Sequence, residues 1–268
     1  MIPFPNFDPV AFRLGSLQIR WYGLAYIVGF TAGYFILKQR LKETGLKLEG
    51  TLPGDFIVTL VFGVLIGARL GYVLFYNPIY YYLHPNEALA FWSGGLSFHG
   101  GLIGAILAGF YFCYKHKVDF LHLADTGVVA GPIALGLGRL GNFVNGELWG
   151  REATVPWAMV FPADPLKLPR HPSQLYEFLL EGVLLTVILW TLRNRPMPRG
   201  TLFWLFILLY GCFRAFGEIF REPDAHLQFI MPGITAGMIL SLPMIGIGAW
   251  RIAVGYRGWA RPAESGHD

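Results

Sequence analysis

Seven apolar runs constrain the fold of this chain more than any other feature of its sequence. Each has about the ~20 residues that a helix needs to cross the hydrocarbon core of a bilayer. The runs cover, approximately, residues 19–37, 55–76, 96–114, 121–143, 174–192, 201–219 and 232–250. Of the 268 residues, 54% are hydrophobic and only 14% are charged, against about 25% charged in an ordinary soluble domain. The sequence therefore predicts an all-α, polytopic membrane protein with seven transmembrane helices in a single domain, residues 1–268.

The distribution of lysine and arginine predicts the orientation of these helices. If the N-terminus lies outside, twelve of the 21 basic residues fall in inner segments, six fall in outer segments and three fall within the spans. Because an excess of basic residues marks the cytoplasmic side, we expect the N-terminus outside and the C-terminus in the cytoplasm. The net charge of +4 then reflects topology and contact with membrane lipid, and it indicates no nucleic-acid partner.

Two of the predicted outer segments are long. They cover about residues 77–95 and 144–173, which exceeds the usual length of a link between neighbouring helices, and such segments commonly carry binding residues. The tail at about residues 260–268 is expected to be disordered. Cys113 and Cys212 lie inside apolar runs, so we interpret them as small packing residues rather than as parts of a disulfide framework or a metal site.

Arg139 lies within an otherwise apolar run, followed at once by amides and a carboxylate. An arginine at the centre of a membrane helix costs roughly 2.5–3.5 kcal/mol on insertion scales, so it is rarely found there without a polar partner or a charged ligand. Asn142 follows three residues later, on the same helical face. A guanidinium and an amide together suit a phosphate or a carboxylate. The alternative is a structural ion pair between Arg139 and Glu147, and the two interpretations can coexist.

A second intramembrane arginine lies on a helical stripe formed by Tyr210, Arg214 and Glu218, spaced at four residues. Arg214 and Glu218 form either a salt bridge only or a second phosphate contact that the carboxylate holds in place. His99 enters the third apolar run beside a glycine pair. Its unperturbed pKa of about 6.5 suits proton abstraction near neutral pH, and the alternative is a packing residue at the membrane interface.

Several other polar residues admit a structural interpretation. Tyr22 belongs either to the aromatic belt of the membrane interface or to the site. Arg69 either reaches a substrate or makes structural pairs, and Asp125 either pairs with a basic residue or caps a helix. Ser173 is the expected N-cap of the fifth span, and the helix dipole favours Glu177 in its first turn.

Four motifs, occurring in order between Arg20 and about Pro232, together resemble those of the bacterial prolipoprotein diacylglyceryl transferases. They are His99-Gly-Gly-Leu-Ile-Gly, Gly138-Arg-Leu-Gly-Asn-Phe-Val-Asn-Gly-Glu147-Leu-Trp-Gly-Arg, Arg170-His-Pro-Ser-Gln-Leu-Tyr-Glu177 and Tyr210-x-x-x-Arg214-x-x-x-Glu218. The resemblance implies a seven-helix, multi-pass enzyme of the bacterial inner membrane, with its chemistry toward the outer, periplasmic side.

The resemblance also implies a reaction. In this family a diacylglyceryl group passes from phosphatidylglycerol to the thiol of the lipobox cysteine of a preprolipoprotein, and glycerol phosphate leaves. A thiol with a pKa near 8.5 needs a base, and a phosphate ester that sheds charge needs cations. By resemblance, His99 is the candidate base, while Arg139 and Arg214 hold the phosphate. The other implied roles are hydrogen bonding for Asn142, orientation of the arginines for Glu147 and Glu218, and lining of the lipid site for Tyr22 and Tyr210. No cofactor or metal is expected.

Two other classes of protein are alternatives to this enzyme. A transporter or channel for an anionic solute also places arginines within the membrane, but the span count is odd, no inverted repeat is apparent, and the polar groups gather at one depth. An intramembrane hydrolase would need Ser97 and His99 as a pair. Residues so close at a helix start do not easily supply a nucleophile, an oriented base and an oxyanion hole.

The predicted orientation can be checked with topology reporters. A reporter fused after Asp268 should be active only in the cytoplasm, and one inserted near Pro162 only outside the membrane, because the basic residues concentrate in the inner segments. Activity from both reporters in full-length protein would be measured in cells. The reverse pattern would refute the placement of the site toward the outer face.

Overall fold

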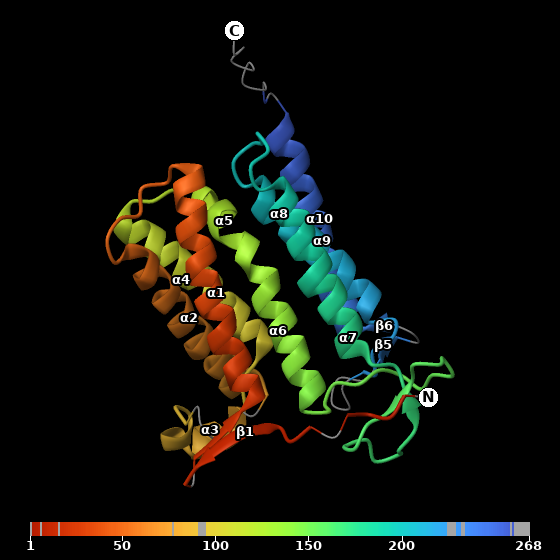
Figure 1. Cartoon of the computed structure of the whole chain (residues 1–268). Helices are drawn as coiled ribbons and strands as arrows, with labels where there is room; N and C mark the ends of the chain where they lie inside the picture. Colours follow the sequence, from red (N-terminus) through yellow and green to blue (C-terminus); the bar gives the residue numbers. More distant parts are fainter. Residues whose placement is uncertain are drawn as a thin grey trace. The chain divides into compact units, whose positions relative to one another are not determined.

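The computed structural model describes residues 2–5, 7–15, 17–76, 78–90, 95–223, 229–231, 234–257 and 259. Within these residues the chain is mostly helical, as the coloured trace of Figure 1 shows. It divides into two compact units, a small unit of Thr44–Leu123 and a large unit of Met1–Glu43 with Ala124–Asp268. The tail that was expected to be disordered, at about residues 260–268, lies outside the described residues.

The helices of each unit follow the apolar runs. Those of the small unit are α2 (Leu52–Phe75), α3 (Pro78–Leu83), η1 (Pro85–Glu87) and α4 (Phe98–His116). Helix α5 (Phe120–Gly127) begins in the small unit and ends in the large one. The other helices of the large unit are α1 (Trp21–Thr44), η3 (Val128–Ala130), α6 (Gly131–Val144), α7 (Ser173–Glu177), the π-helical η4 (Phe178–Leu184), α8 (Leu185–Leu192), α9 (Thr201–Gly217) and α10 (Ala236–Tyr256).

Each predicted span overlaps a helical segment. Within the part of the chain that the structure describes, four segments are both long and apolar enough to cross a membrane, namely Leu52–Phe75, Phe120–Val144, Ser173–Leu192 and Gly237–Tyr256. The apolar helix α9 is shorter, at 17 residues. The protein is thus a helical protein with membrane-spanning helices, whereas the count of seven crossings and the sides of the termini stay predictions.

The expectation of an all-α chain needs one correction. Among the described residues, three two-stranded antiparallel sheets accompany the helices, formed by β1 (Val10–Leu14) with β2 (Leu17–Arg20), β3 (Met159–Val160) with β4 (Pro169–Arg170), and β5 (Phe229–Met231) with β6 (Ile234–Thr235). The search for long apolar runs does not detect such short strands. They occur in connections, where pairing satisfies backbone groups that a helix would otherwise satisfy.

Glycines bring the two long helices of the small unit into backbone contact. Gly63 and Gly67 on α2 face Gly100 and Gly104 on α4, and a Cβ atom built on Gly104 would collide with the carbonyl oxygen of Gly63. Small residues at a spacing of four allow this close approach in membrane helices.

Arg69 has a structural role in the small unit. This buried side chain of α2 donates hydrogen bonds to the carbonyl oxygens of Glu87 (2.7 Å), Ala88 (2.8 Å) and Gly95 (3.1 Å). It therefore holds the connection between α2 and α4 in place. This confirms the interpretation of Arg69 as a residue with structural contacts.

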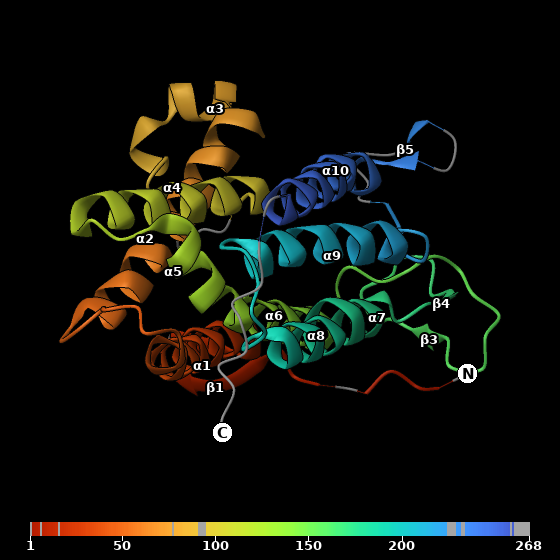
Figure 2. The same cartoon turned by 90° about the horizontal axis from the view of Figure 1, so that it is seen from above.

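The large unit is built on parallel and antiparallel packing of α6, α8, α9 and α10. Figure 2 shows α9 lying alongside α10 on one side and the α7–α8 segment on the other. Its buried core consists of Val129, Leu185, Leu189, Leu202 and Tyr210.

Asp125 fixes the start of α9. Its carboxylate accepts hydrogen bonds from the backbone N–H groups of Gly200 (2.6 Å) and Phe203 (2.8 Å). The expectation that Asp125 caps a helix is confirmed, although the capped helix is α9 rather than its own. The cap satisfies donors that the first turn of a helix leaves free.

The connection between α6 and α7 is folded rather than irregular throughout. β3 pairs with β4, and Phe143, Met159 and Phe161 form a small core beneath it. Near the N-terminus, the backbone N–H of Ile2 donates to the carbonyl of Ala158 at 3.1 Å. This segment, predicted to be an outer one, thus holds its residues in fixed positions at the end of α6.

The glycine contact predicts opposite effects for two identical substitutions. Gly104→Ala should lower the thermal stability of the protein, because the added methyl group overlaps backbone that has no room to move, and overpacking typically costs about 1–3 kcal/mol. Gly246→Ala on α10 is the matched control, because nothing lies within 4 Å of its Cβ position. There the higher helix propensity of alanine, about 1 kcal/mol, should leave stability unchanged or raised. Equal melting temperatures for the two variants would contradict the packing argument.

Candidate active site

Arg139 lies on α6 with its guanidinium against two buried carboxylates. Its Nε atom is 3.1 Å from Glu177 Oε2, and its Nε and Nη2 atoms donate to Glu181 Oε2 at 3.1 and 3.0 Å. Glu177 ends α7 and Glu181 lies in η4, so the contacts join α6 to the neighbouring helical segment. A short approach of Gly136 to Gly182 brings these two segments close enough for the pairs to form.

Arg214 on α9 completes the arrangement from the other side of Glu177. Its Nη1 atom donates to Glu177 Oε1 at 2.5 Å, and its Nη2 atom donates to Glu218 Oε1. Arg221 Nη1 lies 3.5 Å from the same Glu177 oxygen. Glu218 is held in turn by the hydroxyl of Thr235, which donates to its Oε2 atom at 2.6 Å.

These contacts define a cluster of three arginines and three glutamates, called the Arg–Glu cluster below: Arg139, Arg214, Arg221, Glu177, Glu181 and Glu218. Its formal charges balance. Ions buried away from water require such pairing, and removing one partner of a buried pair typically costs about 3–5 kcal/mol. The cluster therefore ties α6, α7 and α9 together.

Arg139 and Arg214 are the most exposed members of the cluster. The side chains of Arg139 and Arg214 are 14% and 17% exposed, whereas those of Glu177 and Glu181 are 1% and 0% exposed. A ligand that reaches the cluster from the surface therefore meets Arg139 or Arg214 before it meets the buried carboxylates. Such a surface is suited to an oxyanion such as a phosphate, which pairs with guanidinium forks through charge-assisted hydrogen bonds.

Glu147 does not pair with Arg139, so the expected Arg139–Glu147 ion pair is wrong. Instead Glu147 Oε1 accepts hydrogen bonds from the side-chain amides of Asn142 (2.9 Å) and Asn145 (3.1 Å). The reason is the end of α6 at Val144 and the turn at Gly146, whose φ of +64° folds the chain back over the helix end. The implied role of Glu147 in orienting an arginine belongs to Glu177 and Glu181.

The two tyrosines lie on helices next to the cluster residues. Tyr22 on α1 shares a hydrogen bond with Tyr26 (3.0 Å between hydroxyls), and its ring packs on Gly141 of α6, one residue before Asn142. Tyr210 is buried on α9, one turn before Arg214. The structure thus gathers Tyr22, Asn142, Tyr210 and the arginines within the large unit.

His99 belongs to the small unit, in the first turn of α4. Its side chain lies outside the described part of the structure, so its assignment as the base stays a prediction. Ser97, two residues earlier, is occupied as the N-cap of α4, because its hydroxyl oxygen accepts from the backbone N–H of Gly100 at 3.2 Å. This role argues against Ser97 as the nucleophile of a hydrolase.

The sequence does not predict Glu181 and Arg221 as members of the site, and it predicts only a structural role for Glu177. Glu177 was interpreted as an acid placed by the helix dipole, and Ser173 as the N-cap. In the structure Pro172 takes the N-cap position without a side-chain hydrogen bond, and the hydroxyl of Ser173 donates to the carbonyl of Leu148 at 3.0 Å. A signal was available, since Glu177 and Glu181 are four residues apart and share one face of an apolar run.

Asp164 and Arg170 stabilise the segment that covers the end of α6. The carboxylate accepts from Arg170 Nε at 2.7 Å and Nη2 at 3.1 Å, and from the backbone N–H groups of Leu166 and Leu168 at 3.2 Å each. The Arg170 guanidinium therefore holds the pKa of the Asp164 carboxyl below its usual value, and the two backbone donors add to this shift. Among the residues that the structure describes, no group of three His, Cys, Asp or Glu side chains is arranged to hold a metal ion.

The fold and the Arg–Glu cluster define a helical membrane protein with paired charges buried among its helices, and comparison with known sequences makes this more specific. The profile of the prolipoprotein diacylglyceryl transferase family matches residues 9–254. The chain belongs to this family.

Similar curated proteins cover nearly the whole chain, and each is called phosphatidylglycerol–prolipoprotein diacylglyceryl transferase. The protein of Geobacter sulfurreducens is 52% identical over 245 residues, which is 91% of this chain and 94% of that protein. That of Bordetella avium is 50% identical over 91% of this chain and 93% of its own length. That of Azotobacter vinelandii is 46% identical over 98% of this chain and 100% of its own length.

The Asp164–Arg170 pair predicts a pH-dependent loss of stability. Because the folded-state pKa of Asp164 is lowered, its contribution is present above the unfolded value of about 3.9 and is lost as the pH falls through the folded value. Asp164→Asn should therefore lower the melting temperature at pH 7, by roughly 2–4 °C for each kcal/mol lost, and the difference from the parent protein should shrink in acid. Glu222→Gln is the control, because Glu222 meets Arg170 from an exposed position. If Asp164→Asn lowered the melting temperature by the same amount at every pH, the ionised carboxylate would not be the source of the stabilisation.

Proposed function

We propose that this protein transfers the diacylglyceryl group of phosphatidylglycerol to the lipobox cysteine thiol of preprolipoproteins, forming a thioether and releasing glycerol phosphate. The observation that carries this proposal is the pair of accessible arginines, Arg139 and Arg214, held by buried carboxylates in an apolar helical protein. The names of the relatives support it, and they favour it over the transport of an anionic solute.

The arginines act on the leaving group. The bond between the glyceryl carbon and the phosphate oxygen breaks, and the oxygen keeps the electron pair, so negative charge grows on glycerol phosphate. Guanidinium groups already in position stabilise this charge without reorganising at the moment of reaction. Arg139 and Arg214 suit this task because both flank Glu177 and reach the surface of the cluster.

The carboxylates of the Arg–Glu cluster are positioning residues. Glu177 contacts both arginines, Glu181 contacts Arg139, and Glu218 contacts Arg214. Paired in this way, each guanidinium has a fixed direction before the lipid arrives. The amide of Asn142, which is fixed by Glu147, offers a hydrogen bond beside Arg139, and Tyr22 and Tyr210 line the space for the lipid.

The thiol half of the reaction needs a proton acceptor. As the sulfur–carbon bond forms, the cysteine proton passes to a base, for which we propose His99. The imidazole is suited to this step near neutral pH. No cofactor takes part in this scheme.

We also propose that the enzyme resides in the bacterial inner membrane as a single domain with seven spans. The N-terminus then lies outside, the C-terminus lies in the cytoplasm, and the site opens toward the periplasmic side. The overlap of each apolar run with a helix supports the count, and the excess of basic residues in the inner segments supports the orientation.

The reaction is tested with purified protein, phosphatidylglycerol and a synthetic lipobox peptide. A mass gain equal to one diacylglyceryl group on the peptide cysteine is expected, together with release of glycerol phosphate. A peptide with serine in place of the cysteine is the control. Uptake of an anion into proteoliposomes without any modified peptide would overturn the proposal in favour of transport.

The phosphate role of Arg139 is tested by a charge-conserving change. Arg139→Lys should be nearly inactive, because lysine keeps the charge but lacks the planar guanidinium that donates hydrogen bonds to two phosphate oxygens at once. Arg13→Lys, at an exposed position of β1, is the control and should keep full activity. Glu147→Gln should reduce turnover less than Arg139→Lys, because an amide still accepts from Asn142. Near-normal turnover of correctly inserted Arg139→Lys would leave only a generic electrostatic role for this residue.

The assignment of His99 is tested by its pH dependence. His99→Gln keeps size and polarity and should lower turnover by roughly 10²–10⁴-fold, the usual contribution of a general base. Part of the loss should return at higher pH, where more of the peptide thiol is already ionised. His84→Gln, on an exposed histidine of the same unit, is the control. Turnover of His99→Gln within a few-fold of the parent enzyme would return His99 to a packing role.

A further inference from the structure

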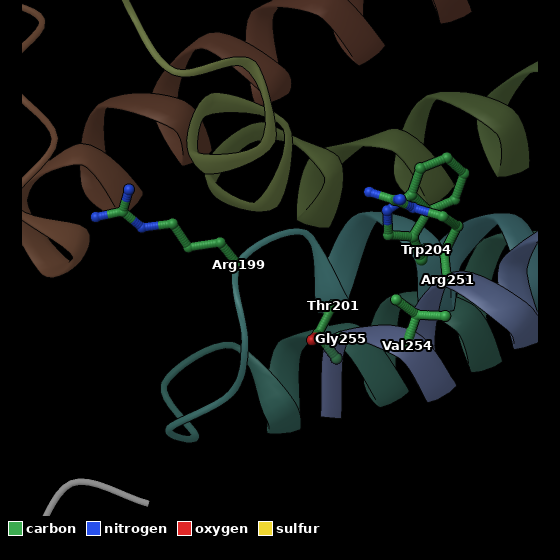
Figure 3. A pocket seen from close by; sticks show the side chains of 6 residues that line it. All are labelled: Arg199, Thr201, Trp204, Arg251, Val254 and Gly255. Carbon is green, nitrogen blue, oxygen red and sulfur yellow. The ribbon is translucent and has the colours of Figure 1, made fainter. Parts of the chain in front are cut away.

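A small polar cavity lies at the other end of the α9–α10 pair from the Arg–Glu cluster. It has a volume of about 70 Å³ and is lined by Arg199, Thr201, Trp204, Arg251, Val254 and Gly255. Figure 3 shows these side chains, which come from the start of α9, from Arg199 two residues before it and from the end of α10. Along α9 alone, ten residues separate Trp204 from Arg214, or about 15 Å at 1.5 Å per residue. The cavity is therefore separate from the proposed active site.

Two buried hydrogen-bond donors in this cavity have no acceptor. They are the indole Nε1–H of Trp204 and the Nε–H of Arg251. Buried donors in folded proteins are nearly always paired, because an unpaired one costs free energy. A pair of unsatisfied donors in one cavity therefore indicates a missing acceptor.

The charge around these donors is positive. The Arg251 guanidinium lies 5.3 Å from the ring centre of Trp204 and 5.7 Å from that of Trp250, and Figure 3 shows it beside the Trp204 ring. Within the described residues, no carboxylate forms an ion pair with it, and none lines the cavity. The hydroxyl of Thr201 donates to the carbonyl of Pro198 at 2.6 Å, and neither unpaired donor forms a hydrogen bond to its oxygen. An anion in the cavity would accept from both donors and would also balance the charge of Arg251, which a neutral acceptor would not do.

The size of the cavity and the surface around it favour a phosphate group attached to an apolar tail. The cavity is large enough for several waters or for one small oxyanion. Ile247, Trp250 and Val254 lie on one stripe of α10 and are 47%, 59% and 37% exposed, and Val254 also lines the cavity. An acyl chain lying along this stripe would bring its headgroup to Arg251.

We propose that this cavity binds the phosphate group of an anionic phospholipid, at a site distinct from the one that holds the substrate lipid. Arg251 and the indole N–H of Trp204 are the donors to the phosphate oxygens, and the apolar stripe of α10 contacts the acyl chain. An unattached phosphate ion offers the same oxygens, but it would make no use of the stripe. Lipid bound here would connect α9 to α10 at the end where Asp125 caps α9.

The test compares lipid binding by variants of the intact purified protein in detergent. Dioctanoyl phosphatidic acid is the probe, because it carries a phosphate and acyl chains without being the donor lipid of the proposed reaction, and native mass spectrometry counts the molecules bound. Arg251→Gln should lose one bound molecule, with at least a tenfold weaker affinity, since a charge-assisted hydrogen bond is removed. Trp204→Phe keeps an aromatic ring and removes the N–H, and it should weaken the same binding step by a few-fold. Arg257→Gln, an exposed residue one turn beyond the cavity lining, is the matched control and should bind as the parent protein does.

Two further measurements separate the possible outcomes. Inorganic phosphate in place of the lipid should bind at least tenfold more weakly, and equal affinity for both would overturn the lipid assignment. Peptide modification by Arg251→Gln and Trp204→Phe should stay within twofold of the parent protein, because neither side chain belongs to the Arg–Glu cluster. Unchanged binding of phosphatidic acid by both variants would refute the site, whatever their catalytic activity.

Discussion

The burial of Glu177 between arginines is the interaction on which the large unit depends. One carboxylate contacts Arg139 of α6 at 3.1 Å, Arg214 of α9 at 2.5 Å and Arg221 at 3.5 Å. In an apolar surrounding each of these charges would be prohibitively costly alone. The helices that carry them are therefore held in one arrangement, because any separation of α6, α7 and α9 would leave a buried charge without its partner.

The same arrangement gives the site its chemistry. The carboxylates lie at the back, where Glu177 and Glu181 are almost fully buried, and the guanidinium groups of Arg139 and Arg214 are the more exposed members. A neutral cluster thereby presents a positive surface to a ligand. Rigid partners on one side of a guanidinium leave its remaining N–H groups directed at the other side, and in the reaction proposed above this is the preorganisation that a developing phosphate charge requires.

The remaining polar groups show how a mostly apolar chain stabilises its connections. Arg69 binds three backbone carbonyls of the α2–α4 connection, Asp125 caps α9, and Asp164 binds Arg170 and two backbone N–H groups beyond α6. In each case a buried charge satisfies backbone groups that no helix or strand satisfies. The unpaired donors of Trp204 and Arg251 depart from this rule, and for that reason they indicate a ligand.

The sequence by itself determined the helical, membrane-spanning class, because the length and hydropathy of a run are local properties. It also selected Arg139 and Arg214, since a charge inside an apolar run is conspicuous, and the order of its motifs placed the chain in its family. Only the tertiary structure decided how the charges pair. Glu147 is eight residues from Arg139 and was the expected partner, but a turn at Gly146 directs it to Asn142, while Glu177 and Glu181 reach Arg139 from a helix some forty residues away. Pairing of this kind depends on which helices pack together, and side-chain packing between distant segments has no local signal in the sequence.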